Sequence, residues 1–373
     1  MLKSYFKDLW NRFVNSKILT KIFIFLFIAL EAFILVISFV KVDYTITTPG
    51  YLTEAKYMVA LDNKNERGHV LTVSVTKYRD VSLIQYWLAK NENRVVIEEK
   101  KNDGLTDAQN DKFGIISKEL AINNAIITAY DAAKKVDPSI KLATEYKGML
   151  VAVVSGDANT DIYPDDEIRE INGVKITKEA DFYNEYYRLL GDDRKGGVLN
   201  IGDSIEFTVT RYNEELKKDI ELKKSAKIYQ NDNGLLTIGL TVYDYTEVNG
   251  NNSYPKFAIT YNEQLDAKGG SGGAMMALSI YNGLLEKDIS NGMIIAGTGT
   301  IDADGQVGAI AGIEQKIIKA FMSRVDVFYV DQYDYADALL ACEKYGYNKD
   351  LVVSISQFDD ILKDLEERGK VNE

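Results

Sequence analysis

Residues 293–316 of this chain read MIIAGTGTIDADGQVGAIAGIEQK and join an apolar run to the start of an amphipathic helix. The run MIIAG at 293–297 is short and apolar, which is typical of a buried strand. Residues 313–324 repeat apolar side chains at helical spacing, and further strands and helices alternate from there toward residue 373. The last segment, residues 235–373, therefore predicts an α/β pattern in which helices cover a sheet.

The helix that begins at residue 313 carries two lysines, Lys316 and Lys319, in different surroundings. At ~100° per residue, Lys316 lies about 80° from the centre of the apolar stripe and Lys319 about 140° from it. A lysine that acts as a base near neutral pH must lose about 2–3 pKa units, which requires burial or a nearby positive charge. Lys316 is the better candidate base, and a surface lysine that lays its stem along the stripe is the alternative. The stripe consists of Ile313, Ile317, Ala320 and Phe321.

A second segment, KGGSGGA at 268–274, places Ser271 among four glycines just before a predicted helix. Glycines allow positive φ and close approach of a ligand, and amides at a helix start stabilise an anion. That anion can be a phosphate or the oxyanion of an acyl-transfer reaction. The chain contains no GxxxxGK[ST] phosphate loop, which favours acyl transfer, with Ser271 as nucleophile supported by Gly270 and Gly272. A serine that only caps the helix is the alternative.

The composition excludes several other kinds of site. The 373 residues include one histidine, His69, and one cysteine, Cys342. They cannot supply a zinc site that needs two histidines or a disulfide framework, and a serine–histidine–aspartate triad would depend on His69 alone. A formal net charge of −12 argues against a nucleic-acid surface. We therefore expect a lysine as the base for Ser271, and no metal, cofactor, ATP or nucleic acid.

The N-terminal segment carries a membrane signal. Residues 22–40, IFIFLFIALEAFILVISFV, contain one charged side chain, Glu31. As a helix they would extend about 28 Å, close to the thickness of a bilayer's hydrocarbon core. The 21 preceding residues carry a net charge of +4, so the positive-inside rule predicts a cytoplasmic N-terminus and an extracellular remainder. The residues that follow form a poor cleavage site, so we expect an uncleaved signal anchor; a cleaved signal peptide and a buried core helix are the alternatives.

The region between the anchor and Ser271 predicts two kinds of structure. Residues 69–75 alternate as a strand, residues 91–112 are polar and predict loops, and residues 115–133 predict a helix that Pro138 ends. A hairpin-rich pattern follows: a strand at 148–154, a hairpin at Asn172-Gly173, a helix at 177–190, and strands at 202–211 and 218–222.

This hairpin-rich order, with the sequence DEIREING at 166–173, resembles the bacterial PDZ domain over residues 136–226. PDZ domains bind an extended peptide by adding it as a strand to the edge of a sheet. The resemblance implies that the strand opened by Gly148, Met149 and Leu150 is this peptide-binding edge strand. A plain core strand is the alternative.

Ser271 and the segment that ends at Lys316 resemble the Lon-type peptidases. Residues 298–316 match that family's pattern T-G-x-I-x-x-x-G-x-V-x-x-I-x-G-[LI]-x-x-K without a gap, and Ser271 precedes Lys316 by 45 positions. The resemblance implies that Ser271 is the nucleophile, that Lys316 is the general base, and that Thr298 hydrogen-bonds the lysine. It covers the last part of the chain and, more weakly, residues 68–133. The family serine often follows Gly-Pro; here Gly269-Gly270 precedes it, which predicts a softer loop.

Together these features predict an α+β protein with an N-terminal transmembrane helix and a Lon-type proteolytic domain that contains an inserted PDZ domain. We expect a cytoplasmic tail at 1–17, a transmembrane signal anchor at 18–41, the first part of the peptidase domain at 42–135, the PDZ domain at 136–226 and the catalytic part at 227–373.

The arrangement is similar to the membrane-anchored, PDZ-containing Lon-like proteases of Gram-positive bacteria. This similarity implies an ATP-independent serine endopeptidase at the outer face of the cell membrane, which cleaves peptides or proteins and can form oligomers. The alternative function is a PDZ-based peptide-binding scaffold whose peptidase fold is inactive.

Overall fold

The structure, a computed structural model, describes residues 5, 10–62, 68–100, 105–262 and 266–372. The chain forms two compact units. The N-terminal unit comprises Met1–Pro49 and Val75–Lys101, and the main unit comprises Gly50–Ser74 and Asn102–Glu373. The predicted first part of the peptidase domain, 42–135, is therefore divided between the two units, because strands β1 (Tyr44–Glu54) and β3 (His69–Tyr78) contribute residues to both.

Among the residues of the N-terminal unit that the structure describes, one helix, α2 (Ile18–Phe39), is long and apolar enough to cross a membrane. Among its residues only Ile37 is buried by the protein. A short helix, α3 (Leu83–Ala89), contacts α2, and β4 (Val96–Glu99) pairs with the first residues of β1. The prediction that residues 91–112 are polar and rich in loops holds in part, because β4 and the start of a helix at Asp107 lie inside this range. The predicted cytoplasmic tail lies partly outside the described residues.

The sheet of the main unit explains why the C-terminal segment reads as alternating strands and helices. Strands β3, β14 (Ile294–Gly297), β17 (Val327–Asp331) and β18 (Val352–Ile355) lie in the order β18-β17-β14-β3, and neighbouring strands run parallel. All five residues of β17 are buried. Parallel strands are covered on both faces, so they are apolar throughout rather than alternating.

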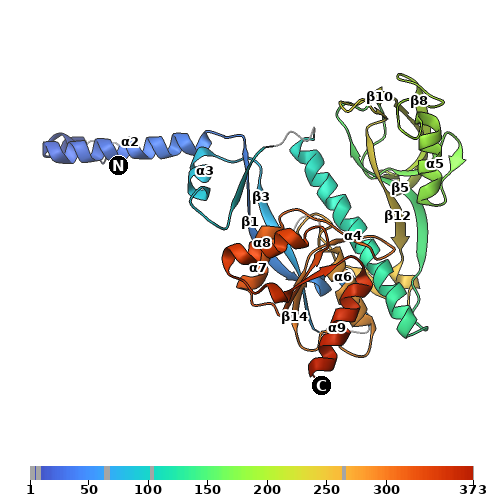
Figure 1. Cartoon of the computed structure of the whole chain (residues 1–373). Coiled ribbons are helices and arrows are strands. Elements are labelled where there is room, and N and C mark those ends of the chain that lie inside the picture. Colours follow the sequence, from blue (N-terminus) through green and yellow to red (C-terminus); the bar gives the residue numbers. More distant parts are fainter. Residues whose placement is uncertain (1–4, 6–9, 63–67, 101–104, 263–265, 373) are drawn as a thin grey trace. The chain divides into compact units, whose positions relative to one another are not determined.

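Helices cover both faces of this sheet (Figure 1). The first face packs against α4 (Asp107–Val136), α6 (Gly273–Leu284) and α9 (Phe358–Asn372); the second packs against α7 (Ile313–Met322) and α8 (Tyr335–Tyr345). The predicted helices in the C-terminal segment are present, with ends displaced by a few residues. The helix predicted at 115–133 is longer, since Thr106 and Gln109 form a capping box that starts α4 at Asp107.

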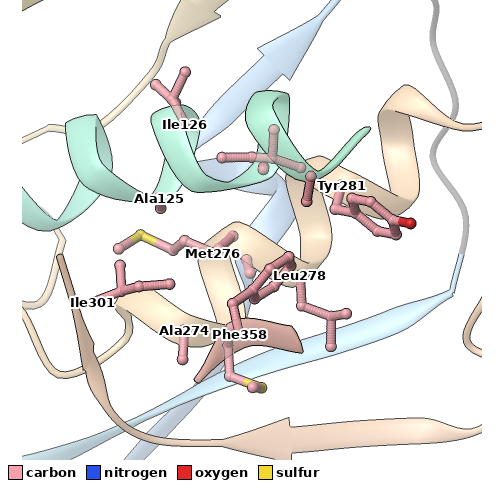
Figure 2. Close-up of a cluster of buried hydrophobic side chains, with 14 of the residues drawn as sticks. Ala125, Ile126, Ala274, Met276, Leu278, Tyr281, Ile301 and Phe358 are labelled. Atoms are coloured by element: carbon pink, nitrogen blue, oxygen red, sulfur yellow. The ribbon is translucent and has the colours of Figure 1, made fainter. Parts of the chain in front are cut away.

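The contact between α4 and α6 positions the segment that contains Ser271. Figure 2 shows Ala125 of α4 next to Met276 of α6, and both side chains are buried. Ala125 is small and lets the two helices approach closely. The N-terminus of α6 is therefore held by the core rather than by a loop alone.

Between α4 and α6 the chain forms a separate antiparallel sheet, which we call the inserted module (Thr144–Val248). Its strands follow the order β12-β5-β6-β8-β9, with β7 paired to β6, and one helix packs on it. The elements are β5 (Thr144–Val154), β6 (Glu167–Ile171), β7 (Val174–Lys175), α5 (Glu179–Leu190), β8 (Ser204–Asn213), β9 (Lys218–Lys227), β10 (Tyr229–Gln230), β11 (Leu236–Thr237) and β12 (Leu240–Val248). The predicted boundary at 226 falls short, because Ile228, Leu236 and Ile238 lie in the module's core.

The structure contradicts the prediction that Gly148, Met149 and Leu150 belong to an edge strand. Their strand, β5, lies inside the sheet, between β12 and β6. Met149 pairs with Asp244 of β12 and with Ile168 of β6, and it is 0% exposed. The prediction failed because β12 is far downstream in the chain, and a strand pairing of such long range leaves no local pattern around Gly148.

The remaining elements are short. They are η1 (Ala55–Tyr57), β2 (Val59–Leu61), η2 (Gly250–Asn252), β13 (Phe257–Ile259), β15 (Thr300–Ile301), β16 (Val307–Gly308) and η3 (Lys349–Leu351). Strands β15 and β16 form a hairpin inside the 297–316 segment, between Thr298 and α7.

Candidate active site

Ser271 lies two residues before α6, in a loop fixed at both ends by backbone hydrogen bonds. The Gly269 amide donates to the carbonyl of Gly114 on α4 at 2.8 Å, and the Gly273 amide donates to Gly270 at 3.0 Å. The carbonyl of Ser271 accepts from the Gly299 amide at 2.8 Å. Ser271 is only partly buried, and its backbone is thus held in place.

The glycines beside Ser271 mainly allow the loop to pack closely against its neighbours, and few of them adopt unusual backbone angles. In segment 268–274 only Gly269 has a positive φ, +90°. A Cβ atom on Gly270 would lie 3.0 Å from the carbonyl oxygen of Ser117, and one on Gly272 would lie 3.0 Å from Cγ2 of Thr72. The loop is thus pressed against α4 and β3, and a larger residue at either position would move Ser271.

Lys316 of α7 and Thr298, which follows β14, meet Ser271 directly. The Lys316 amine lies 2.9 Å from Ser271 Oγ and 2.9 Å from Thr298 Oγ1. The Thr298 hydroxyl donates to the carbonyl oxygen of Ser271 at 3.0 Å. The structure therefore brings together the three residues that the sequence singled out, from three separate segments. Lys319, the other lysine of α7, is partly exposed and is not in this group.

Burial determines the protonation of Lys316. The side chain is 2% exposed, and burial lowers the pKa of Lys316 to about 7. The carboxylate of Asp334 raises this pKa and the ammonium of Lys118 lowers it, both as smaller effects. At neutral pH a large fraction of Lys316 is consequently the free amine, which can accept a proton from a hydroxyl at hydrogen-bond distance.

Lys118 is a second buried lysine at this site, and the sequence did not indicate it. It is 4% exposed, on α4, and a Cβ on Gly272 would lie 3.8 Å from its ammonium nitrogen. Burial lowers the pKa of Lys118, while the charge of Asp266 opposes that shift. Helical spacing places Lys118 about 200° from Ile116, on an apparently polar face. That face is nonetheless covered, because the Ser271 loop packs against α4 there, with Gly270 close to the carbonyl of Ser117 and Gly272 close to the ammonium of Lys118.

Two backbone amides are available to stabilise an anion beside Ser271. Within the described part of the chain, the amides of Ser271 and Gly272 donate no hydrogen bond to a protein acceptor. They lie at the N-terminal end of α6, where the helix dipole favours negative charge. Such donors suit the oxyanion that forms when a serine attacks a carbonyl.

The other candidate side chains lie elsewhere. His69 is exposed at the start of β3, and its Nδ1 lies 2.7 Å from Oε1 of Glu54. Cys342 is buried within α8, where burial raises the pKa of its thiol. Across the residues that the structure describes, no group of three or more His, Cys, Asp or Glu side chains could hold a metal ion.

A scan against protein-family models finds no match to the chain, and a search of curated proteins finds no match either. The role of Ser271, Lys316 and Thr298 is therefore inferred from their geometry.

Proposed function

We propose that this protein is an ATP-independent serine endopeptidase of the Lon type, with Ser271 as nucleophile and Lys316 as general base. One observation carries the proposal: a buried lysine amine with a pKa of about 7 lies 2.9 Å from the hydroxyl of a glycine-flanked serine. A structural lysine would instead be expected to pair with a carboxylate, since an unpaired buried charge is costly.

The hydrogen bonds around Lys316 orient its lone pair. The Thr298 hydroxyl uses its proton on the Ser271 carbonyl, so its oxygen can accept an N–H from Lys316. With that N–H directed to Thr298, the lone pair of the neutral amine is free for the hydroxyl proton of Ser271. Thr298 is thus a positioning residue in this proposal.

Peptide cleavage then proceeds in two stages. The amine of Lys316 takes the proton of Ser271 while Oγ forms a bond to the scissile carbonyl carbon, and the carbonyl electron pair moves onto oxygen. The amides of Ser271 and Gly272 stabilise that oxyanion. Collapse breaks the C–N bond, and the Lys316 ammonium protonates the departing amine. Lys316 then deprotonates a water that attacks the acyl-enzyme, which releases the acid and restores Ser271.

The proposal also covers the remaining parts of the chain. We infer that the inserted module is a PDZ-type domain, supported by its antiparallel sheet and single packed helix α5. Peptide addition to β5 is not part of this proposal, since β12 occupies that edge. We infer that α2 is an uncleaved signal anchor, with the N-terminus in the cytoplasm and the main unit outside, supported by the apolar length of α2 and its basic flank.

Cleavage of an unfolded protein distinguishes this function from the alternative, an inactive peptide-binding scaffold. Purified full-length chain is incubated with a casein labelled with a fluorophore, without ATP, alongside the Ser271→Ala variant. We expect wild-type protein to release fluorescent peptides and the variant to release none. If both bind casein equally and neither cleaves it, the scaffold function is correct and the peptidase proposal is wrong.

A further inference from the structure

Helix α3 is apolar, but the protein does not bury it. Its seven residues read LIQYWLA, and none of them is buried. Gln85 turns back to accept a hydrogen bond from the Ser82 amide at 2.8 Å, as part of a capping box. Trp87 is 49% exposed and Leu88 is 71% exposed, whereas Leu83, Ile84, Tyr86 and Ala89 are half-buried. The exposed face of α3 is therefore mainly apolar and lacks the polar side chains that water favours.

The backbone ties α3 to the end of α2. The Leu83 amide donates to the carbonyl of Val40 at 2.8 Å, and the Val42 amide donates to Val81 at 3.0 Å. From this point α3 returns alongside α2, because the rings of Trp87 and Phe33 lie 6.4 Å apart. Phe33 precedes the last residue of α2 by six positions, or about 9 Å along the helix.

We propose that α3 lies in the outer leaflet of the membrane beside α2, with Trp87 and Leu88 among the lipid chains. This inference depends on the proposal that α2 spans the bilayer. If Phe33 lies within the hydrocarbon region, then a ring in contact with it lies at the same depth. The occupant is lipid rather than a protein partner, because the exposed face of α3 continues the lipid-facing surface of α2 within one compact unit.

The flanking residues limit the depth of α3. The chain becomes polar directly after α3, with the sequence KNENR at 90–94, so the end of α3 lies no deeper than these long charged side chains can reach back to the head groups. At the opposite end, Lys41 and Asp80 form an exposed ion pair at 2.8 Å, level with the end of α2. Tryptophan is also enriched near the membrane interface, where lipid chains meet head groups. The anchor therefore consists of a spanning helix and a short helix in the outer leaflet.

Tryptophan fluorescence tests the inference, since the chain has only two tryptophans. The Trp10→Phe variant of the full chain leaves Trp87 as the only tryptophan, and it is reconstituted into phosphatidylcholine–phosphatidylglycerol vesicles. Lipids with bromine on the upper part of the acyl chain should quench Trp87 roughly twofold or more, and aqueous acrylamide should quench it weakly.

Two matched variants, both lacking Trp10 and Trp87, give the quenching expected in water and in the bilayer. Tyr212→Trp, at an exposed position of the inserted module, gives the quenching of a tryptophan in water. Phe27→Trp, within α2, gives the quenching of a tryptophan in the bilayer interior. If Trp87 behaves as Tyr212→Trp does while Phe27→Trp is quenched by bromolipid, α2 enters the membrane and the inference about α3 is wrong. If bromolipid does not quench Phe27→Trp either, α2 does not enter the membrane, and the inference about α3 is wrong as well.

Discussion

Lowering the pH from 8 to 6 should slow the acylation of Ser271 about tenfold, because it protonates Lys316. Burial moves the pKa of Lys316 from 10.5 to about 7. At a pKa of 7, roughly 90% of the lysine is the free amine at pH 8 and roughly 10% at pH 6. An unperturbed lysine would be neutral in about one molecule in three thousand at pH 7, so burial contributes about 5 kcal/mol toward the reactive form.

The assay is the rate at which a fluorophosphonate probe labels the full chain between pH 5.5 and 9, followed by intact-protein mass. We expect the rate to rise about tenfold from pH 6 to pH 8 and then level off, with a midpoint near 7. The Lys319→Ala variant should give the same curve, because Lys319 lies outside the site. A rate that is still rising steeply at pH 9, as for an exposed lysine, would refute the proposed effect of burial on Lys316.

Three further variants test the surroundings of the dyad. Lys118→Met removes a positive charge that lowers the pKa of Lys316, so the midpoint of the labelling curve should move to higher pH; Lys134→Met, at the exposed end of α4, should leave it in place. Gly272→Ala should slow labelling by about tenfold or more, because its Cβ would lie 3.0 Å from Cγ2 of Thr72. Adding Thr72→Ser, which removes that methyl group, should restore much of the rate, and a double variant as slow as Gly272→Ala would contradict the steric explanation. Lys316→Met should be inactive but raise the melting temperature at pH 7, because an ammonium buried in the folded state destabilises it. The lowered pKa of Lys316 costs wild-type stability most at and below pH 7 and less as pH rises toward 10.5, so the difference in melting temperature measured by calorimetry should shrink over that range.

Two of the three residues that meet at the site, Ser271 and Lys316, left a local signal in the sequence, whereas Thr298 was predicted only from the resemblance to Lon-type peptidases. Ser271 lies among glycines before a helix, and Lys316 lies at the edge of an apolar stripe. The burial of Lys316 follows from that stripe, because α7 packs against the sheet through it. Most helices and strands of the C-terminal segment were predictable for the same reason: their periodicity is local.

Features that depend on distant contacts were not predictable. Lys118 reads as a surface lysine, and only the packing of α4 against the Ser271 loop covers it. The resemblance to PDZ domains implied that β5 is an edge strand, but its pairing with β12 makes it a core strand, which was the alternative. In both cases the deciding neighbour is distant in sequence, so helical or strand periodicity around the residue carries no trace of it.

The most direct test of the central claim is the labelling rate of Ser271 with and without a base at position 316. Full-length wild type, Ser271→Ala and Lys316→Arg are each exposed to a fluorophosphonate at pH 7.5, and the labelled residue is identified by peptide mass. We expect one label on Ser271 in wild type, none in Ser271→Ala, and a rate at least about 100-fold lower in Lys316→Arg, because arginine keeps its proton at this pH. Labelling of Lys316→Arg at the wild-type rate would contradict the assignment of Lys316 as the base that activates Ser271.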